Sequence, residues 1–358
     1  TADADETYRE LYRHSPRDAE TYFRFGPLMG QIGMAVRPIL ETIAPNAISP
    51  SLSDLAATKK LLDHFKTLSD EQFEYLTKLM TMSSADFLDE WFEFEPLKAT
   101  MSSSGIIGTF MGPRSPGSAY VMLHHYMGDI DGAFRAWGFQ RGGTGAVSMA
   151  IARSAEHFGA DIMTEAPVEK VIVKNGRAVG VALENGDEYS SNIVISGLDP
   201  KLSFLKLVDE SDLPQDFVSD INNFRIRGSS GKVNLALDGL PDFTGLPGQG
   251  PHLRGAISIS PDFDYIEKAY DDAKYGNFSQ EPYMDIILPS VLDPEMAPPG
   301  KHVMSCFVQY APYNINGWWN DQKREAFGDA VVNTIARFAP NIRDIILHRQ
   351  VLTPADLE

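Results

Sequence analysis

The chain has 358 residues, with 31 Lys and Arg against 49 Asp and Glu, which gives a formal net charge of −18. This charge repels nucleic-acid phosphates, so we expect no nucleic-acid partner. The longest stretch without a charged side chain, residues 302–320, contains a proline and several asparagines, so we expect no transmembrane span. Cys306 is the only cysteine, which excludes an internal disulfide and a zinc site built from several cysteines.

The first 140 residues have the pattern of short helices separated by prolines. Phe73, Leu76 and Met80 recur at helical spacing, and Ser69 and Ser83 are candidate N-caps. A stretch rich in Ser and Gly, residues 102–118, predicts a loop region.

The character of the sequence changes at residue 141. A Gly-Gly pair precedes a helical run over residues 146–158 that ends at Gly159. The pairs Asn175-Gly176 and Asn185-Gly186, flanked by β-branched residues, predict two-residue turns with positive φ in a three-stranded meander. Residues 193–196 predict one more short strand.

Beyond residue 200, helical and strand patterns alternate irregularly. The predicted strands are residues 232–237, 256–260, 284–289, 303–310 and 345–352. The predicted helices are residues 202–207, 217–224, 262–275 and 321–338, the last of them capped by Asn320. This order favours a mixed or antiparallel sheet covered by helices, and hence an α/β or mixed α+β fold class.

The glycine cluster is the first candidate for chemistry. Gly143-x-Gly145-x-x-Ser148 is close to the dinucleotide-binding fingerprint and opens a helix. The third glycine is Ser148, however, and no buried strand precedes the cluster. We therefore favour a tight turn, where backbone passes close to another group, over a Rossmann pyrophosphate loop.

Three other patterns are weaker. His124 and His125, followed by Asp129 and Asp131, could suggest a metal site, but ordinary loop histidines are the favoured interpretation. Residues 228–232 end like a P-loop but lack its first glycine. No G-x-S-x-G motif supports a serine hydrolase.

Aromatic residues gather around the end of the strand predicted at residues 303–310. Tyr310, Tyr313 and Trp318 are candidates to line a substrate pocket, because aromatic rings form flat walls for planar or apolar ligands. The favoured alternative is packing of this loop against the helix that follows it.

Residues 120–200, 292–313 and 351–358 together resemble the phytoene desaturase-related FAD oxidoreductases, which share the fold of the flavin amine oxidases. Within that family they are similar to the subgroup named after a pyridine nucleotide-disulphide oxidoreductase domain. The resemblance covers nearly the whole chain. The disulphide in that subgroup's name has no counterpart here, because Cys306 is alone.

The resemblance implies a partial FAD/NAD(P)-binding domain and a substrate domain. Residues 1–140 would form a largely helical substrate side, 141–200 a return segment of the FAD domain, 201–345 the substrate sheet, and 346–358 a strand back toward the FAD domain. By resemblance, FAD contacts fall on Gly142, Gly143, Val168, Ser196 and Gly197. No catalytic residue and no metal ligand is implied.

The implied function is hydride transfer from a small organic, partly apolar substrate to FAD, in the cytoplasm or, in a eukaryote, the mitochondrion. The family's N-terminal G-x-G-x-x-G unit and its C-terminal flavin motif are not in the printed sequence. We therefore expect a fragment that is inactive alone, with the surfaces near Val168 and Gly197 exposed or sealed in a homo-oligomer. The alternative is a scaffold that binds a partner protein or lipid and has lost its flavin site.

Overall fold

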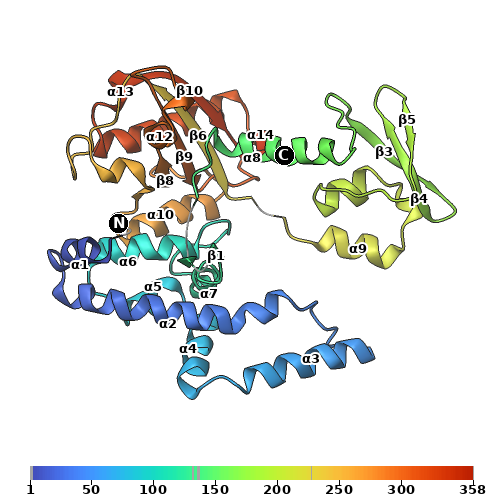
Figure 1. The fold of residues 1–358 in the computed structure, drawn as a ribbon, viewed down its shortest axis with the longest axis horizontal. Coiled ribbons are helices and arrows are strands. Elements are labelled where there is room, and N and C mark those ends of the chain that lie inside the picture. Colours follow the sequence, from blue (N-terminus) through green and yellow to red (C-terminus); the bar gives the residue numbers. More distant parts are fainter. Residues whose placement is uncertain (1–2, 131–132, 135–137, 227, 358) are drawn as a thin grey trace. The chain divides into compact units, whose positions relative to one another are not determined.

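The computed structural model describes residues 3–130, 133–134, 138–226 and 228–357 (Figure 1). The chain divides into two compact units. Unit 1 consists of Thr1–Gly143 and Arg227–Glu358, and unit 2 consists of Thr144–Ile226. Unit 2 is therefore an insertion between the two parts of unit 1, and each unit has its own elements.

The N-terminal part of unit 1 is helical, as the sequence predicts. Its helices are α1 (Ala4–Tyr12), α2 (Pro16–Leu40), α3 (Leu52–Phe65), α4 (Asp70–Thr81), α5 (Ser84–Asp89), α6 (Glu95–Ser102) and α7 (Ser118–His124), with a short 3₁₀ turn η1 (Ser103–Gly105). Ser69 forms a capping box with Gln72, and Ser83 caps α5 through the amide of Asp86. Both predicted N-caps are confirmed.

The helices of this part pack around their own hydrophobic core, which includes Phe25, Leu79 and Phe87. Three apolar residues of α4 recur at helical spacing, but only one of them is buried. Leu76 is buried, whereas Phe73 is 57% exposed and Met80 is 47% exposed. A two-residue ladder, β1 (Asp129–Ile130) with β2 (Ala133–Phe134), follows α7.

The C-terminal part of unit 1 is an antiparallel sheet of five strands in the order β10-β6-β9-β8-β7. The strands are β6 (Ser230–Leu237), β7 (Ile257–Ile259), β8 (Tyr283–Ile287), β9 (His302–Gln309) and β10 (Ile346–Leu352). The predicted strands and the antiparallel sheet are confirmed.

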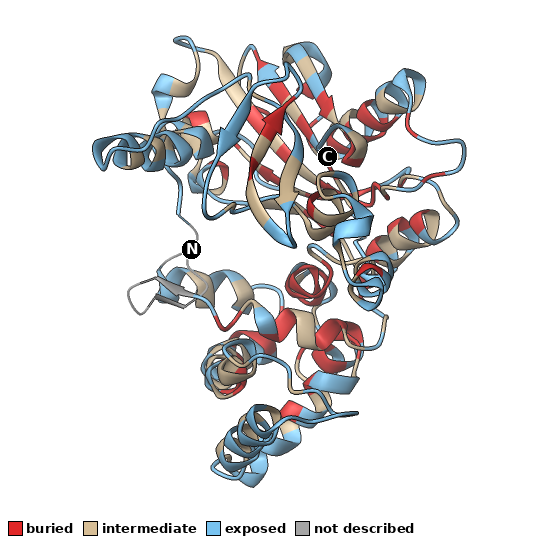
Figure 2. Cartoon of the chain, turned by 90° about the vertical axis from the view of Figure 1, so that its right-hand side faces the viewer, coloured by how far each residue is buried: buried red, intermediate tan, exposed pale blue. Residues whose placement is uncertain are grey.

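Helices and short turns surround this sheet. They are η4 (Pro251–Arg254), α10 (Phe263–Lys274), α11 (Pro289–Leu292), η5 (Pro294–Met296), α12 (Asp321–Phe338), α13 (Ile342–Ile345) and α14 (Pro354–Leu357). Asn320 caps α12, and its side chain accepts a hydrogen bond from the Lys323 amide at 2.9 Å. Val331 of α12 belongs to the same hydrophobic core as Val233 and Cys306 of the sheet, so α12 covers one face of the sheet (Figure 1). Figure 2 shows buried residues along the strands and helices of this part.

The Ser/Gly-rich segment between α6 and α7 is a loop apart from η1, as predicted, but much of it is buried. Side chains from the sheet hold its backbone: Gln309 Nε2 donates to the Ile106 carbonyl at 3.1 Å, and Tyr310 Oη donates to the Met111 carbonyl at 2.6 Å. The loop therefore joins the helical part of unit 1 to the sheet.

Unit 2 contains α8 (Gly143–His157), from its second residue on, and the meander β3 (Val168–Lys174), β4 (Arg177–Leu183) and β5 (Glu188–Ser190). A π-helical turn (Leu202–Lys206), a 3₁₀ turn (Glu210–Asp212) and α9 (Gln215–Asn223) complete it. The predicted end of the first helix is confirmed, because Gly159 has φ of 89°.

The first predicted turn is confirmed: Asn175 and Gly176 have φ of 53° and 71°, as a type I′ turn requires. The second prediction is wrong in detail. Gly186 has φ of 91°, whereas Asn185 is not in the left-handed region. Because the Leu183 amide bonds to the Asp187 carbonyl, this loop has one more residue and places a bulge at Gly186.

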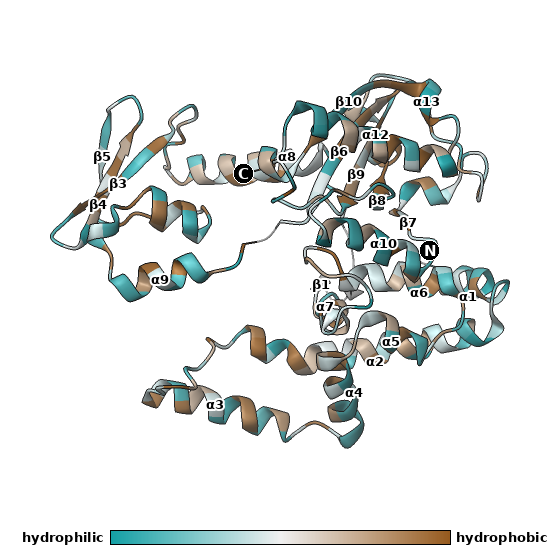
Figure 3. Ribbon diagram, turned by 180° about the vertical axis from the view of Figure 1, so that it is seen from behind, coloured by the Kyte–Doolittle hydropathy of each residue, from teal (hydrophilic) through white to brown (hydrophobic). Residues whose placement is uncertain are grey.

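The predicted strand at residues 193–196 does not form. These residues have no ladder partner among the described residues, and Ile193 and Ile195 are 73% and 89% exposed. Figure 3 shows the apolar residues of α8 and of the meander by hydropathy. No helix in the described part of the chain is long and apolar enough to cross a membrane.

Candidate functional site

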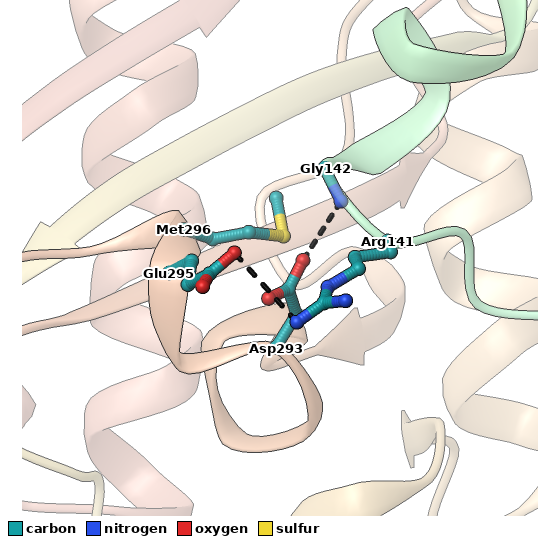
Figure 4. A pocket seen from close by; sticks show the side chains of 5 residues that line it. All are labelled: Arg141, Gly142, Asp293, Glu295 and Met296. Carbon is teal, nitrogen blue, oxygen red and sulfur yellow. Dashed lines mark hydrogen bonds and ion pairs between the residues drawn. The ribbon is translucent and has the colours of Figure 1, made fainter.

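A pocket of about 490 Å³ lies in unit 1, where the segment that leads into α8 meets the turn after α11 (Figure 4). Arg141 and Gly142 line it on one side, and Asp293, Glu295 and Met296 line it on the other. Gly142 and Gly143 have φ of 77° and 76°, a conformation that glycine adopts without strain. The pair of glycines therefore lets the chain turn sharply into the helix.

Hydrogen bonds and charges hold the two sides of this pocket together. The Gly142 amide donates to the Asp293 carboxylate at 2.7 Å. This bond places an anion beside the positive N-terminal end of α8, which is a favourable arrangement. Arg141 and Glu295 approach to 3.9 Å, but both side chains are about four-fifths exposed, so this ion pair adds little stability.

Gly143 lies close to Met296, which lines the side of the pocket opposite Arg141 and Gly142. A Cβ atom at this position would come within 3.3 Å of the Met296 methyl group. The sequence predicts a close approach to backbone or to the place of the flavin, and the nearest neighbour in unit 1 is instead a flexible side chain. A larger residue at 143 would therefore meet strain from its φ as well as a crowded neighbour.

The other residues implied to contact FAD lie in unit 2. Val168 begins β3 opposite Leu183 and is 37% exposed. Ser196 Oγ lies 2.6 Å from Ser203 Oγ and accepts from the Leu198 amide at 3.3 Å. Gly197 is exposed, and a Cβ there would have no neighbour within 4 Å. These residues are exposed at the surface of unit 2, and their contact with FAD stays a prediction.

The aromatic residues predicted to line a substrate pocket do not gather in one. Tyr310 is fully buried and packs with Ile106 and Tyr283 in a small core. Tyr313 and Trp318 form an edge-to-face pair with ring centroids 5.1 Å apart, and Trp318 is 47% exposed. Their role in substrate binding stays a prediction.

Metal and thiol chemistry find no support in the described residues. No group of three or more His, Cys, Asp or Glu side chains there could hold a metal ion. Asp131 of the His-Asp pattern lies outside the described residues. Cys306 is buried, and burial raises the pKa of its thiol to about 12, so this thiol is unreactive.

Sequence reasoning missed Asp293 and Met296 as members of the pocket. Asp293 lies 151 positions beyond Gly142, and only the fold brings these residues together. Leu292 to Met296 belong to one of the stretches that carry the family resemblance. That resemblance is the one feature of the sequence that could have pointed to these residues.

Comparison with known proteins agrees with that resemblance. No protein-family model matches the chain. The rat pyridine nucleotide-disulfide oxidoreductase domain-containing protein 2 is 37% identical over 372 residues, covering 99% of this chain and 64% of the rat protein. A phytoene desaturase (lycopene-forming) from a Paracoccus species is 23% identical over 366 residues, covering 99% of this chain and 64% of that enzyme.

A solved structure described as an oxidoreductase from Methanosarcina mazei matches with a TM-score of 0.53 at 16% identity, covering 80% of this chain and 62% of that one. It supports the fold alone. In sequence the chain is similar to pyridine nucleotide-disulfide oxidoreductase domain-containing protein 2 and, at lower identity, to a phytoene desaturase and to prolycopene isomerases. Its fold is similar to that of the Methanosarcina oxidoreductase. The chain spans just under two thirds of the length of the pyridine nucleotide-disulfide oxidoreductase relatives.

Proposed function

We propose that the chain is the larger part of an FAD-dependent oxidoreductase that removes hydride from a small organic substrate. The similarity to a phytoene desaturase (lycopene-forming) and to prolycopene isomerases supports redox or isomerisation chemistry on an organic substrate. Bound flavin would accept the hydride, and the protein would bind and orient the substrate and exclude water.

The observation that carries this proposal is the uncovered helix α8. Its sequence includes Val147, Met149 and Ile151, and none of its residues is buried. These three side chains are 43%, 57% and 66% exposed. A helix that is largely apolar around its circumference is normally buried.

Further apolar residues of unit 2 are exposed, including Phe158, Ile193, Ile195 and Leu198. Such a surface marks a packing or binding site. We propose that the rest of a cofactor-binding domain covers it, because the relatives are longer than this chain. A second copy of the chain is the alternative cover.

Each unit, taken by itself, has residues that would contact the cofactor. The Gly142–Gly143 turn, fixed by the Asp293 carboxylate, would allow close approach of the flavin to backbone. In unit 2, Val168 would contact the adenine end, and Ser196 and Gly197 would lie toward the pyrophosphate. Pyrophosphate contacts normally come from a glycine-rich loop at a helix N-terminus, and the printed sequence has no G-x-G-x-x-G motif.

A flavin titration tests the proposal. We expect residues 1–358 alone to be colourless and to bind FAD weakly, because a few hydrogen bonds of ~1 kcal/mol each do not offset an association cost of ~4 kcal/mol or more. The protein with the family's flanking motifs restored should bind FAD stoichiometrically. If that longer protein also fails to bind FAD, the scaffold interpretation replaces the enzyme.

Gly143→Val in the longer protein gives a second test. It should lower the melting temperature, because a side chain is strained at φ of 76°, and it should reduce flavin occupancy, measured by bound-flavin absorbance, even at temperatures where the variant stays folded. Gly145→Val is the matched control, because a Cβ at Gly145 meets nothing within 4 Å. Full flavin occupancy in the folded variant would assign this glycine to the fold alone.

A further inference from the structure

Two helices of unit 1 carry exposed apolar stripes that are separate from α8. On α3, Leu52, Leu55 and Leu62 lie on one face, because residues three and seven positions apart share a side of a helix. Leu52 is 87% exposed, and Leu55 and Leu62 are each more than half exposed. On α4, Phe73 and Met80 are likewise seven positions apart and exposed. Figure 3 shows apolar residues along α3.

The opposite face of α3 holds this helix to the rest of unit 1. Phe65 packs against the helical core, and His64 Nε2 lies 2.7 Å from the Ala35 carbonyl oxygen in α2. Ser51 and Asp54 form a capping box at the start of the helix. Because α3 is anchored through this side, its leucine stripe is left uncovered by its own chain.

The charged residues on the leucine stripe of α3 are mainly basic. Lys59 and Lys66 follow Leu55 and Leu62 by four positions, so they lie on the same face. Their side chains are 79% and 76% exposed. Asp63 pairs with Lys59 at 2.7 Å and with Lys66 at 3.4 Å. One carboxylate against two lysines leaves this stripe with an excess of positive charge.

The stripe of α4 is bordered by acidic residues instead. Asp70 lies three positions before Phe73, and Glu74 lies four positions after Asp70, so both carboxylates stand beside the stripe. Both residues are exposed. Lys78 is 3.7 Å from Glu74 but 2.8 Å from Glu90, which is its nearer partner. The apolar stripe of α4 therefore carries negative charge.

The two stripes complement each other in apolar surface and in charge. In a single chain they do not cover each other, because both are exposed. A second copy of the chain supplies the missing partner for each stripe, and a twofold axis then repeats the contact. Exposed ion pairs add little energy, so the apolar side chains would supply the affinity and the charges would select the pairing.

We propose that α3 of one copy packs against α4 of a second copy, and α4 of the first against α3 of the second, in a symmetric homodimer. The net charge of −18 on each copy opposes association, but salt screens it beyond about 10 Å, whereas the charges of the two stripes lie in contact. The inference goes beyond the proposed function, because it concerns assembly and not flavin chemistry.

Sedimentation velocity of the 358-residue chain tests the dimer. Every protein in this test carries Ile151→Glu, which removes association through the apolar surface of α8. We expect a dimer, and Leu62→Gln should raise its dissociation constant at least tenfold. Leu347→Gln on β10 is the matched control, because Leu62 and Leu347 are both 55% exposed. It should leave the dimer unchanged.

Charge reversal tests which helices pair. One variant carries Lys59→Glu and Lys66→Glu on α3, and the other carries Asp70→Lys and Glu74→Lys on α4. Each variant alone places like charges opposite each other and should be monomeric. An equimolar mixture restores opposite charges at both contacts, so it should form a heterodimer. Circular dichroism would check that both variants stay folded.

Three outcomes overturn the proposal. The first is a chain that is monomeric with Ile151→Glu in place, whether or not it floats with phosphatidylcholine vesicles through the α3 leucines. In the case of flotation, a lipid surface replaces the second copy. The second is a dimer that Leu62→Gln leaves unchanged, and the third is a mixture of folded charge-reversal variants that forms no heterodimer.

Discussion

At the scale of single residues, the carboxylate of Asp356 is held in its charged form by several hydrogen bonds. Arg324 donates to its carboxylate at 2.7 and 3.2 Å, and the Thr353 amide donates at 2.8 Å. Chiefly through the hydrogen bonds from Arg324, and also through those from Thr353, the pKa of Asp356 falls to about 2. The bonds to this carboxylate tie α14 to α12.

This lowered pKa predicts a pH dependence of stability. Because the folded pKa lies below the ordinary value of 3.8, the carboxylate stabilises the fold fully above about pH 4. That contribution, about 1 kcal/mol after solvent screening, is lost as the pH falls toward 2. Thermal melting between pH 7 and pH 2.5 should show a smaller acid-induced drop for Asp356→Asn than for the native chain. Identical drops would assign the acid sensitivity to other carboxylates.

At the scale of elements, the hairpins of unit 2 show which turns local sequence controls. Asn175 and Gly176 both have positive φ, so the two-residue loop follows from residue type. At the second turn the hydrogen bond from the Leu183 amide to the Asp187 carbonyl selects a longer loop. Glycine alone takes the left-handed position there.

Gly180 of β4 tests how tightly this meander is packed. A Cβ at Gly180 would lie 2.2 Å from the Tyr189 carbonyl oxygen, which is backbone and cannot move aside cheaply. We expect Gly180→Ala to lower the free energy of unfolding of unit 2 by about 2–3 kcal/mol, measured by urea titration. Gly145→Ala on α8 is the control and should be neutral or stabilising by up to about 1 kcal/mol. Similar effects at both positions would contradict the close approach at β4.

For the whole molecule, the main question is what covers α8 and its neighbours. The two units differ in this respect, because the sheet core of unit 1 is closed by α12, whereas α8 in unit 2 has no buried residue. An uncovered apolar surface promotes association and binds hydrophobic dyes.

Ile151→Glu distinguishes the two environments of α8. In residues 1–358 alone, Ile151 is 66% exposed, so the change should reduce dye binding and self-association without lowering the melting temperature. In the longer protein the same change should destabilise the fold by about 3 kcal/mol or more, because it buries a charge. A harmless Ile151→Glu in the longer protein would show that its additional segments do not cover this helix.

The sequence by itself determined the features that depend on residues close together in the chain. These are the helix caps at Ser69, Ser83 and Asn320, the type I′ turn at Asn175, and the strand pattern of the large sheet. Each depends on a side chain or φ preference that acts within a few residues. The family resemblance was also visible in the sequence, in residues 120–200, 292–313 and 351–358.

Only the tertiary structure decided which distant residues meet. Asp293 bonds to Gly142 across 151 positions, and the register of β6, β9 and β8 aligns Lys232, Phe307 and Asp285. The strand predicted at residues 193–196 was wrong, because a strand forms only with a partner that satisfies its backbone. Long-range pairing depends on how the whole chain packs, and a local sequence pattern does not contain that information.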